Sequence, residues 1–280
     1  MIVMTLEEKR NSLQRTLREM GKVVVAYSGG VDSTFLLKAA VDTLGVENVL
    51  ACIGSSASLA RSQYEQAIEC GKLIGAKVEE VVVDEVADSN YAANKADRCF
   101  HCKSHLYKLL NDIAKEKGFD CVVCGSNADD MGDFRPGNRA AKVFGVRSPL
   151  AEAGLTKAEI RELSREMGLP TAEAVASPCL ASRIMYGLEV TEARLKQVED
   201  AEDFLRGLGL EEFRVRHHDT VARVEVHVED IEKVTSKTNR SRIVAMFKSI
   251  GFKYVALDLE GFRSGSLNDV LTEEQKRANA

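Results

Sequence analysis

Ser28-Gly29-Gly30-Val31-Asp32-Ser33 is the stretch that decides the fold of this chain. It follows a short apolar run, 22–27, and precedes an apolar-periodic segment, 34–40. This order predicts a strand, a tight glycine turn and a helix. Two adjacent glycines let backbone N–H groups point into one concavity, and the N-terminus of the helix favours anions. The stretch therefore predicts a cradle for a polyphosphate.

The side chains of this stretch suit the same ligand. Ser28 and Ser33 can donate hydroxyl hydrogen bonds to phosphate oxygens, and Asp32 can hold a magnesium ion. The alternative is a plain strand-to-helix turn with Asp32 or Ser33 as a helix cap. The stretch lacks the ending of a Walker A loop and the spacing of a dinucleotide fingerprint. It resembles the PP-loop of the N-type ATP pyrophosphatases, which implies that a substrate oxygen attacks the α-phosphorus of ATP and pyrophosphate leaves.

The first half of the chain alternates strand-like and helix-like segments. Helices of ordinary length separate short apolar runs, which is typical of a parallel sheet with right-handed crossovers. Ligands of such sheets lie beyond the carboxyl ends of the strands. The expected strands are 22–27, 49–53, 77–84 and 120–124, with helices over 59–74 and 102–117. The segments at the carboxyl ends are 28–33, 54–56, 84–88 and 125–130.

The second half changes character near residue 188. A capping box of Thr156 and Glu159 predicts a helix over 156–167, whereas 132–139 and 171–187 are expected to be irregular. The later expected elements are helices 191–208 and 240–250 and strands 213–217, 221–228 and 254–258. We therefore expect an α/β fold: a parallel-sheet PP-loop domain (adenine nucleotide α-hydrolase-like) over 1–187, and a small α+β domain over 188–280 for substrate binding or oligomerisation.

Composition narrows the class of protein. With 45% hydrophobic and 29% charged residues, the 280-residue chain is typical of a soluble globular protein. No apolar run approaches the ~18 residues of a membrane span, and the N-terminus does not resemble a secretion signal, so a cytoplasmic protein is expected. The net charge of −5 gives no bulk support for nucleic-acid binding.

Seven cysteines in such a chain favour metal binding or reactive thiols over disulfides. Cys99 and Cys102 would share one helix face, and Cys179 is the candidate third ligand because it lies in an irregular segment. Three interpretations stand: a [4Fe–4S] cluster, a zinc site completed by His101 or His105, or unliganded thiols. Cys121 and Cys124 have the same spacing in a strand, where they would face opposite ways; with Cys52 and Cys70, they are expected to be small buried residues.

Taken together, the motifs resemble one family. The PP-loop, the pair Cys99/Cys102 and the segments 125–130, 135–137 and 177–183 occur in the order found in the LarE family of sulfur transferases. The resemblance implies ATP-dependent adenylation and then thiolation of the carboxylates of a pyridinium dicarboxylate mononucleotide, in the biosynthesis of the nickel-pincer nucleotide of lactate racemase. Some members give up the sulfur of one cysteine, which matches Cys179. The additional Cys99 and Cys102 make this chain similar to members whose three cysteines hold a [4Fe–4S] cluster carrying a transferable sulfide.

The expected site follows from the motifs and the resemblance. Cys179, Asp32 and Arg183 are the expected catalytic residues, and Cys99, Cys102 and Cys179 the expected cluster ligands. The expected partners of ATP and Mg²⁺ are Ser28, Gly29, Gly30, Asp32, Ser33, Ser55, Gly125, Asn127, Asp129 and Arg135. Guanidinium groups match phosphate and carboxylate geometry. The expected ligands of the substrate's anionic groups are Arg183, Arg214, Arg216 and Arg263.

Three competing functions remain at this point. A cluster-dependent tRNA thiolase would use the same chemistry, and a PP-loop amidotransferase or ligase would leave the three cysteines without a role. A nucleotide-binding regulatory module with a structural zinc is the alternative outside enzymes. The resemblance also implies a homo-oligomer supplied by a sulfide source. His217 and His218 are expected at a strand end, and Arg223 and Glu225 are expected to form a surface ion pair of little energetic value.

Overall fold

The computed structural model describes residues 4–132, 136–175, 177–263, 265–272 and 274. By their internal contacts, these residues form two compact units. The described parts of 4–85 and 99–177 make the first unit, and those of 86–98 and 178–274 make the second. This division by contacts lies ten residues before the boundary expected at 187/188, and the domain assignment itself stays a prediction. None of the described helices is long and apolar enough to cross a membrane.

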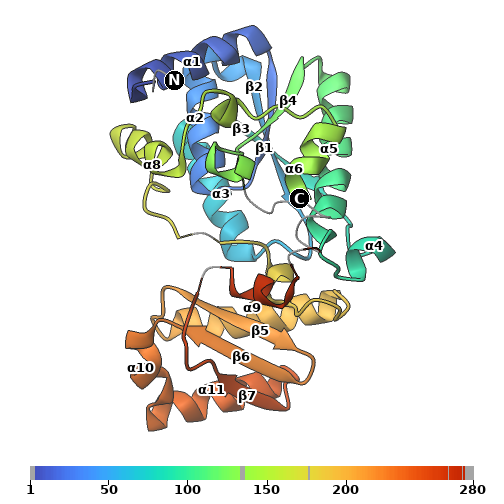
Figure 1. The fold of residues 1–280 in the computed structure, drawn as a ribbon, viewed down its shortest axis with the longest axis vertical. Helices are drawn as coiled ribbons and strands as arrows, with labels where there is room; N and C mark the ends of the chain where they lie inside the picture. Colours follow the sequence, from blue (N-terminus) through green and yellow to red (C-terminus); the bar gives the residue numbers. More distant parts are fainter. Residues whose placement is uncertain (1–3, 133–135, 176, 264, 273, 275–280) are drawn as a thin grey trace. The chain divides into compact units, whose positions relative to one another are not determined.

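The first unit is built on a four-stranded parallel sheet with the order β3-β2-β1-β4 (Figure 1). Its strands are β1 (Val23–Tyr27), β2 (Val49–Ser55), β3 (Lys77–Val82) and β4 (Cys121–Cys124). All four expected strands and their parallel pairing are confirmed. In the register, Tyr27 pairs with Ile53 and Ala26 with Cys124. The segments that follow β1, β2 and β4 therefore emerge at one edge of the sheet.

Helices cover both faces of this sheet. The helices of the unit are α1 (Leu6–Met20), α2 (Val31–Leu44), α3 (Arg61–Ile74), α5 (Arg98–Lys117), α6 (Pro136–Val143), α7 (Pro149–Glu152) and α8 (Lys157–Glu166). The first residue of α5, Arg98, belongs to the second unit. Buried residues of α1, α2 and α8 pack with Val23 and Val25 on one face. Those of α5 and α6 pack with Val24 on the other. Cys121 and Cys124 pack on opposite faces, as expected for strand residues three apart.

Two parts of this unit differ from expectation. Helix α1 was not predicted, although Thr5 and Glu8 form a complete capping box at its start. The loop expected over 132–139 is wrong from residue 136 on, because α6 begins at Pro136. Proline is favoured at the first helical position, where its missing N–H has no partner to lose. The helix over 156–167 is confirmed, with its capping box of Thr156 and Glu159.

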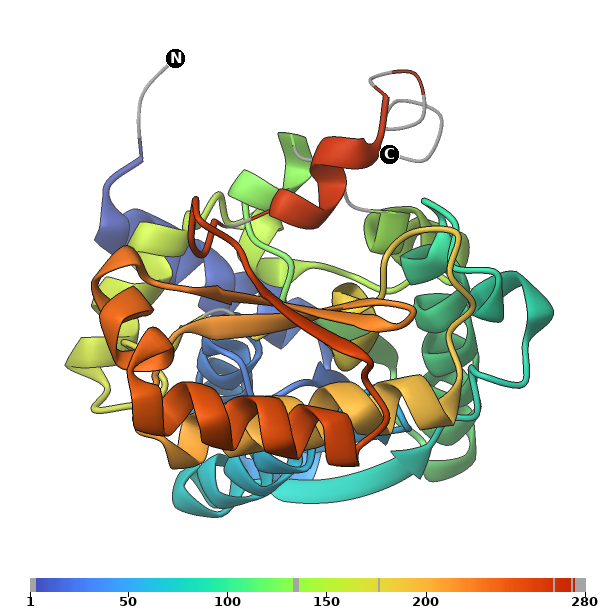
Figure 2. The same cartoon turned by 90° about the horizontal axis from the view of Figure 1, so that it is seen from below.

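The second unit has a three-stranded mixed sheet with the order β5-β6-β7. Its strands are β5 (Phe213–His218), β6 (Val221–Val226) and β7 (Tyr254–Leu257), and its helices are α4 (Ser89–Ala92), α9 (Glu192–Gly207), α10 (Ile231–Thr235) and α11 (Lys237–Ser249). Figure 2 shows α9 and α11 together on one side of this sheet. They pack there on Val215, Val224 and Val226. Arg214 and Arg216 alternate with the buried valine of β5, so their side chains lie on the opposite face.

Candidate active site

The PP-loop stretch connects β1 to α2 as predicted. Two features of the structure, a backbone angle and a close approach, each require glycine at position 29. Gly29 has φ +72°, which L side chains rarely adopt. A Cβ there would also lie 2.5 Å from Cβ and 2.8 Å from Cα of Ala67. Gly30 is the N-cap of α2, and no side chain caps that helix. The first N–H groups of α2 are therefore left for a ligand or solvent.

The two loop serines face each other across this turn. Their Oγ atoms lie 3.0 Å apart, and the Ser28 N–H donates to Ser33 Oγ at 3.2 Å. Ser33 is buried and its hydroxyl donates to the Gly30 carbonyl oxygen, whereas Ser28 is exposed. The turn is therefore pre-shaped by its own hydroxyl groups.

The segment after β4 closes on the same loop. A Cβ on Gly125 would lie 2.9 Å from the Ser33 backbone nitrogen, so only glycine permits this approach. Asn127 accepts from the Asp129 N–H through Oδ1 at 2.9 Å, and its Nδ2 lies 3.5 Å from Asp32 Oδ1. Asp129 in turn accepts from the Lys157 N–H at the start of α8, at 2.8 Å. Gly125, Asn127 and Asp129 are thus brought together with Asp32 and Ser33.

Lys157 belongs to this group and was missed from the sequence. Its Nζ lies 2.6 Å from Asp32 Oδ2, and both side chains are partly exposed. A signal existed, because a lysine in the first turn of a helix opposes the helix dipole. A cation there is stabilised only by a nearby anion, which Asp32 supplies.

Ser55 is not among the residues that these contacts bring together. The Ser55 hydroxyl hydrogen bonds to Glu80 and, with Tyr64, lowers the pKa of that exposed carboxyl. Ser55 ends β2, and Glu80 lies in the neighbouring strand β3. Arg135, expected to contact ATP, lies outside the described residues.

The expected metal ligands belong to different units. Cys99 and Cys102 lie in the first turns of α5, exposed and half-buried respectively, in the first unit. Cys179 is half-buried and precedes the short 3₁₀ helix η3 (Leu180–Arg183) in the second unit. Among the residues that the structure describes, no group of three or more His, Cys, Asp or Glu side chains is arranged to hold a metal ion. The three-cysteine cluster therefore stays a prediction.

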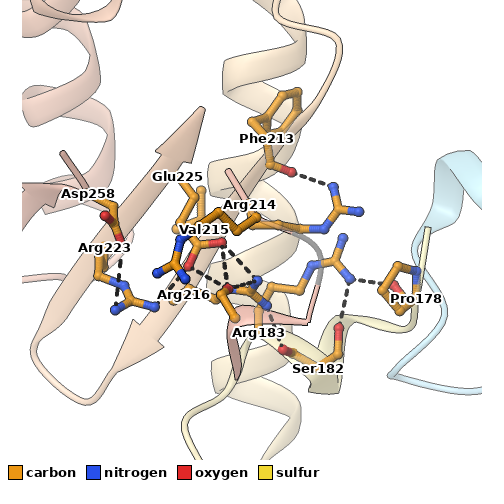
Figure 3. A network of polar contacts seen from close by, with 12 residues as sticks. Pro178, Ser182, Arg183, Phe213, Arg214, Val215, Arg216, Arg223, Glu225 and Asp258 are labelled. Atoms are coloured by element: carbon orange, nitrogen blue, oxygen red, sulfur yellow. Dashed lines mark hydrogen bonds and ion pairs between the residues drawn. The ribbon is translucent and has the colours of Figure 1, made fainter. Parts of the chain in front are cut away.

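Arg183 anchors the cysteine segment from within. Its guanidinium is 2% exposed and bonds Glu202 twice, at 2.9 and 3.1 Å. The remaining terminal nitrogen donates to the carbonyl oxygens of Pro178 and Cys179 and to Ser182 Oγ. Glu202 also accepts from the Val215 N–H at 3.1 Å. Every nitrogen of the Arg183 guanidinium is thus engaged, and together these bonds tie the backbone at Cys179 to Glu202 of α9. Figure 3 shows the bonds from Arg183 to Pro178 and Ser182.

Arg216 forms a second buried pair beside the first. It donates to Glu225 at 2.8 and 3.0 Å, to the Ser182 carbonyl oxygen at 3.0 Å and to Ser266 Oγ at 2.9 Å. Glu225 also accepts from Arg223 at 2.8 Å. The expected ion pair of Arg223 and Glu225 is confirmed, but its expected place at the surface is wrong, because Glu225 is 0% exposed. Three charged or polar partners offset the desolvation of this carboxylate.

Arg214 and Arg263, the other two arginines expected to bind substrate, have different surroundings. Burial, and then the charge of Arg183, lowers the pKa of Arg214 to about 10. Its guanidinium lies 4.9 Å from the centre of the Phe262 ring and donates to the Phe213 carbonyl oxygen. Arg263 is half-exposed and pairs with Glu260 and Asp269 at the surface. His217 and His218 end β5 as expected.

Comparisons with known proteins place this geometry in a family. The NAD synthase family model matches residues 5–120, which include the PP-loop. The chain is 38% identical to pyridinium-3,5-bisthiocarboxylic acid mononucleotide synthase of Lactiplantibacillus plantarum, over 97% of this chain and 98% of that protein. It is 43% identical to an uncharacterised Synechocystis protein, over 96% and 100%. An NH₃-dependent NAD⁺ synthetase of Chlorobaculum tepidum is 28% identical over 54% of each chain.

The match to the NAD⁺ synthetase covers about half of the chain, whereas the first two relatives cover it almost from end to end. ATP and Mg²⁺ use is common to the PP-loop enzymes that the PP-loop half resembles. The full-length match extends this likeness through the Cys179 segment and the second unit. The chain therefore belongs to the LarE family of ATP-dependent sulfur transferases, within the PP-loop superfamily.

Proposed function

We propose that this chain adenylates and then thiolates the carboxylates of a pyridinium dicarboxylate mononucleotide, in nickel-pincer nucleotide biosynthesis. The observation that carries the proposal is the end-to-end likeness to a pyridinium-3,5-bisthiocarboxylic acid mononucleotide synthase. In the first step, a substrate carboxylate oxygen bonds to the α-phosphorus of ATP, and the bond from that phosphorus to the pyrophosphate oxygen breaks. In the second, sulfide bonds to the activated carbon and AMP leaves, so no oxidant or reductant is needed.

We assign the first step to the loop after β1. The backbone of Gly29 and Gly30 and the hydroxyls of Ser28 and Ser33 would bind the ATP phosphates. Asp32 offers the hard oxygen ligands that Mg²⁺ prefers, and Lys157 beside it would neutralise phosphate charge. The proposed remaining contacts to the nucleotide and its metal are Ser55, Gly125, Asn127, Asp129 and Arg135.

We assign the second step to the cysteines. The fit to a cluster rests on the donor set: two thiols three residues apart on one helix, and a third that is half-buried. Cys99, Cys102 and Cys179 would hold a [4Fe–4S] cluster, which when bound would supply sulfide to the activated carbon. Arg98, whose side chain bonds the Ala181 carbonyl oxygen, directly precedes Cys99 in the sequence. In the alternative, Cys179 itself gives up its sulfur.

The arginines take different proposed roles. Arg214 remains the strongest candidate for a substrate phosphate or carboxylate, because a buried guanidinium beside Arg183 gains from an incoming anion. Arg183 and Arg216 already bond carboxylates, so we assign them to holding the Cys179 segment. Arg263 stays a weaker candidate at the surface.

The resemblance also supports three proposals that the geometry leaves open. These are that the chain works as a homo-oligomer in the cytoplasm, that a sulfide donor reloads it, and that the finished cofactor serves an enzyme of the lactate racemase type. Size-exclusion chromatography with light scattering tests the first of these directly.

The decisive experiment separates the metal from the chemistry. Anaerobically purified protein is analysed for iron, sulfide and zinc, and compared with Cys99→Ala and Cys121→Ala. Cys121→Ala is the control, because Cys121 has the same spacing to Cys124 as Cys99 has to Cys102 but lies in a strand. We expect about four irons and four sulfides per chain, lost in Cys99→Ala and kept in Cys121→Ala. No iron after reconstitution would return the sulfur to Cys179, and one zinc would favour the regulatory module.

The same preparations are then given ATP, Mg²⁺ and the pyridinium dicarboxylate mononucleotide. We expect substrate-dependent release of pyrophosphate and formation of a thiocarboxylate, seen by mass spectrometry. Pyrophosphate release that responds to tRNA instead of this mononucleotide would contradict the proposal and favour a tRNA thiolase. In that case, retention on RNA should weaken steeply with salt.

A further inference from the structure

Two residues far from Cys179 in the sequence hold the backbone on its C-terminal side. Asn94 is 0% exposed, and its Nδ2 lies 2.8 Å from the carbonyl oxygens of both Met185 and Leu188. Those two contacts use both amide protons, and the Ile184 carbonyl oxygen lies farther away, at 3.3 Å. The Asn94 carbonyl oxygen accepts from the Gly187 N–H at 3.1 Å. Asn94 therefore bonds three residues of the chain that follows Cys179: Met185 and Leu188 through its side chain, and Gly187 through its backbone.

Arg98 extends this contact toward the cysteine. Its guanidinium is 3% exposed and donates to Asn94 Oδ1 and, at 2.9 Å, to the Ala181 carbonyl oxygen. It also lies 5.7 Å from the centre of the Tyr186 ring. The hydrogen bond from Arg98 to Asn94 Oδ1 therefore links the two residues directly. All of these contacts lie within the second unit.

The backbone of Asn94 shows that the position is specialised. Its φ is +51°, and only one other non-glycine residue among those described, Asp219, has a positive φ. Asparagine tolerates this conformation better than most residues, but glycine adopts it at lower cost. The hydrogen bonds of the side chain, and not the backbone conformation alone, therefore account for an asparagine at this position. These bonds go to carbonyl oxygens of 184–188 and to Arg98.

We propose that Asn94 and Arg98 are positioning residues for sulfur transfer, because they fix the backbone of residues 181–188 and with it the direction of the Cys179 thiol. The role in sulfur transfer rests on the proposed function. The contacts of Asn94 and Arg98 with residues 181–188, which we call the clamp, do not depend on it. Both residues belong to the second unit, whereas the PP-loop belongs to the first. Loss of the clamp should therefore impair sulfur transfer and spare adenylation.

Two variants separate positioning from folding. Asn94→Gly keeps the positive φ without strain and removes the side-chain bonds, whereas Asn94→Asp keeps size and the acceptor for Arg98 but removes the donor to the carbonyl oxygens. Asp219→Gly is the matched control, because it makes the same backbone change at an exposed turn. All three proteins are compared with wild type in the full chain.

The first readout needs no substrate. Hydrogen exchange of the amides of 182–190 and the rate at which iodoacetamide modifies Cys179 are followed by mass spectrometry. We expect both to rise at least about tenfold in Asn94→Gly and Asn94→Asp, while Asp219→Gly matches wild type. Unchanged rates in both Asn94 variants would overturn the clamp, whatever the enzyme's reaction proves to be.

The second readout measures adenylation and sulfur transfer separately. We expect both Asn94 variants to release substrate-dependent pyrophosphate at the wild-type rate and to form thiocarboxylate at least about tenfold more slowly. A proportional loss of both steps would overturn a positioning role and leave a structural one. If wild type itself shows no thiocarboxylate, the proposed function fails, and hydrogen exchange alone then decides whether the clamp exists.

Discussion

The loop after β1 and the segment that carries Cys179 are built in opposite ways. The loop is local: glycines at 29, 30 and 125 bring backbone nitrogens together, and serine hydroxyls complete the turn. The cysteine segment has no such repeat or glycine pattern. Buried side chains far away in the sequence, from Asn94 to Arg216, bond its carbonyl oxygens one by one. A phosphate-binding loop needs only backbone N–H groups that point to one place. The direction of a thiol, by contrast, is fixed only when several side chains hold the backbone around it.

The sharpest test of this contrast removes Arg183. Breaking a buried ion pair from one side costs about 3–5 kcal/mol because the partner carboxylate is left unpaired. We expect Arg183→Ala to lower the free energy of unfolding by about this amount in urea denaturation. Arg263→Ala, which loses only surface pairs, should change it by about 0–1 kcal/mol. Equal effects of the two substitutions would mean that the Arg183 network does not hold the segment.

The loop should respond to changes in its backbone instead. Gly29→Ala combines a positive φ with a clash against Ala67 and is expected to cost about 3 kcal/mol in unfolding free energy. Gly118 has the same φ of +72° with nothing within 4 Å of a Cβ, so Gly118→Ala should cost about 1 kcal/mol. Isothermal calorimetry should show ATP binding lost only in Gly29→Ala. Equal stability losses would show that the close approach to Ala67 contributes nothing.

The stability of the second unit should also depend on pH. Burial lowers the pKa of His217 from 6.5 to about 4, and it also lowers that of His218. Between those pH values, the unfolded chain binds a proton that the folded one does not, so stability falls as the pH falls from 6.5 toward 4. The loss in unfolding free energy should be about 1–3 kcal/mol. It is measured by urea titration across this range.

His217→Gln provides the comparison, since an amide can still donate to Gln197. We expect this variant to lose most of the dependence on pH. An unaltered slope would assign the titration to other groups.

The smallest expected effect belongs to Lys157. Lys157→Met should raise the KM for ATP about tenfold, because a charge-assisted bond to phosphate is lost. Its effect on stability should be about 0–1 kcal/mol, since the pair with Asp32 is partly exposed. Lys9→Met is the matched control: it removes a lysine that pairs with the same helix through Glu159, at 2.7 Å. A similar change in KM would show that Lys157 only positions α8.

The sequence was sufficient to predict the parts of the fold that are encoded by repeating or alternating residue patterns. The strands of the parallel sheet, the loop after β1 and the capping box of α8 follow from local patterns of residues 22–167, and all are present. It was insufficient for Lys157 and for the burial of Glu225, because both depend on partners that only the fold brings near. Arg183 was expected to meet substrate, yet its bonds go to Glu202 and the cysteine segment. Nothing local in 177–183 indicates that partner.

If the loop activates the substrate and Cys179 serves only the delivery of sulfur, replacing Cys179 should separate the two steps. Single-turnover assays of wild type and Cys179→Ser, with ATP, Mg²⁺ and the pyridinium mononucleotide, measure both products at once. We expect Cys179→Ser to release pyrophosphate at the wild-type rate and to form no thiocarboxylate. Thiocarboxylate formed by Cys179→Ser at the wild-type rate would contradict this separation.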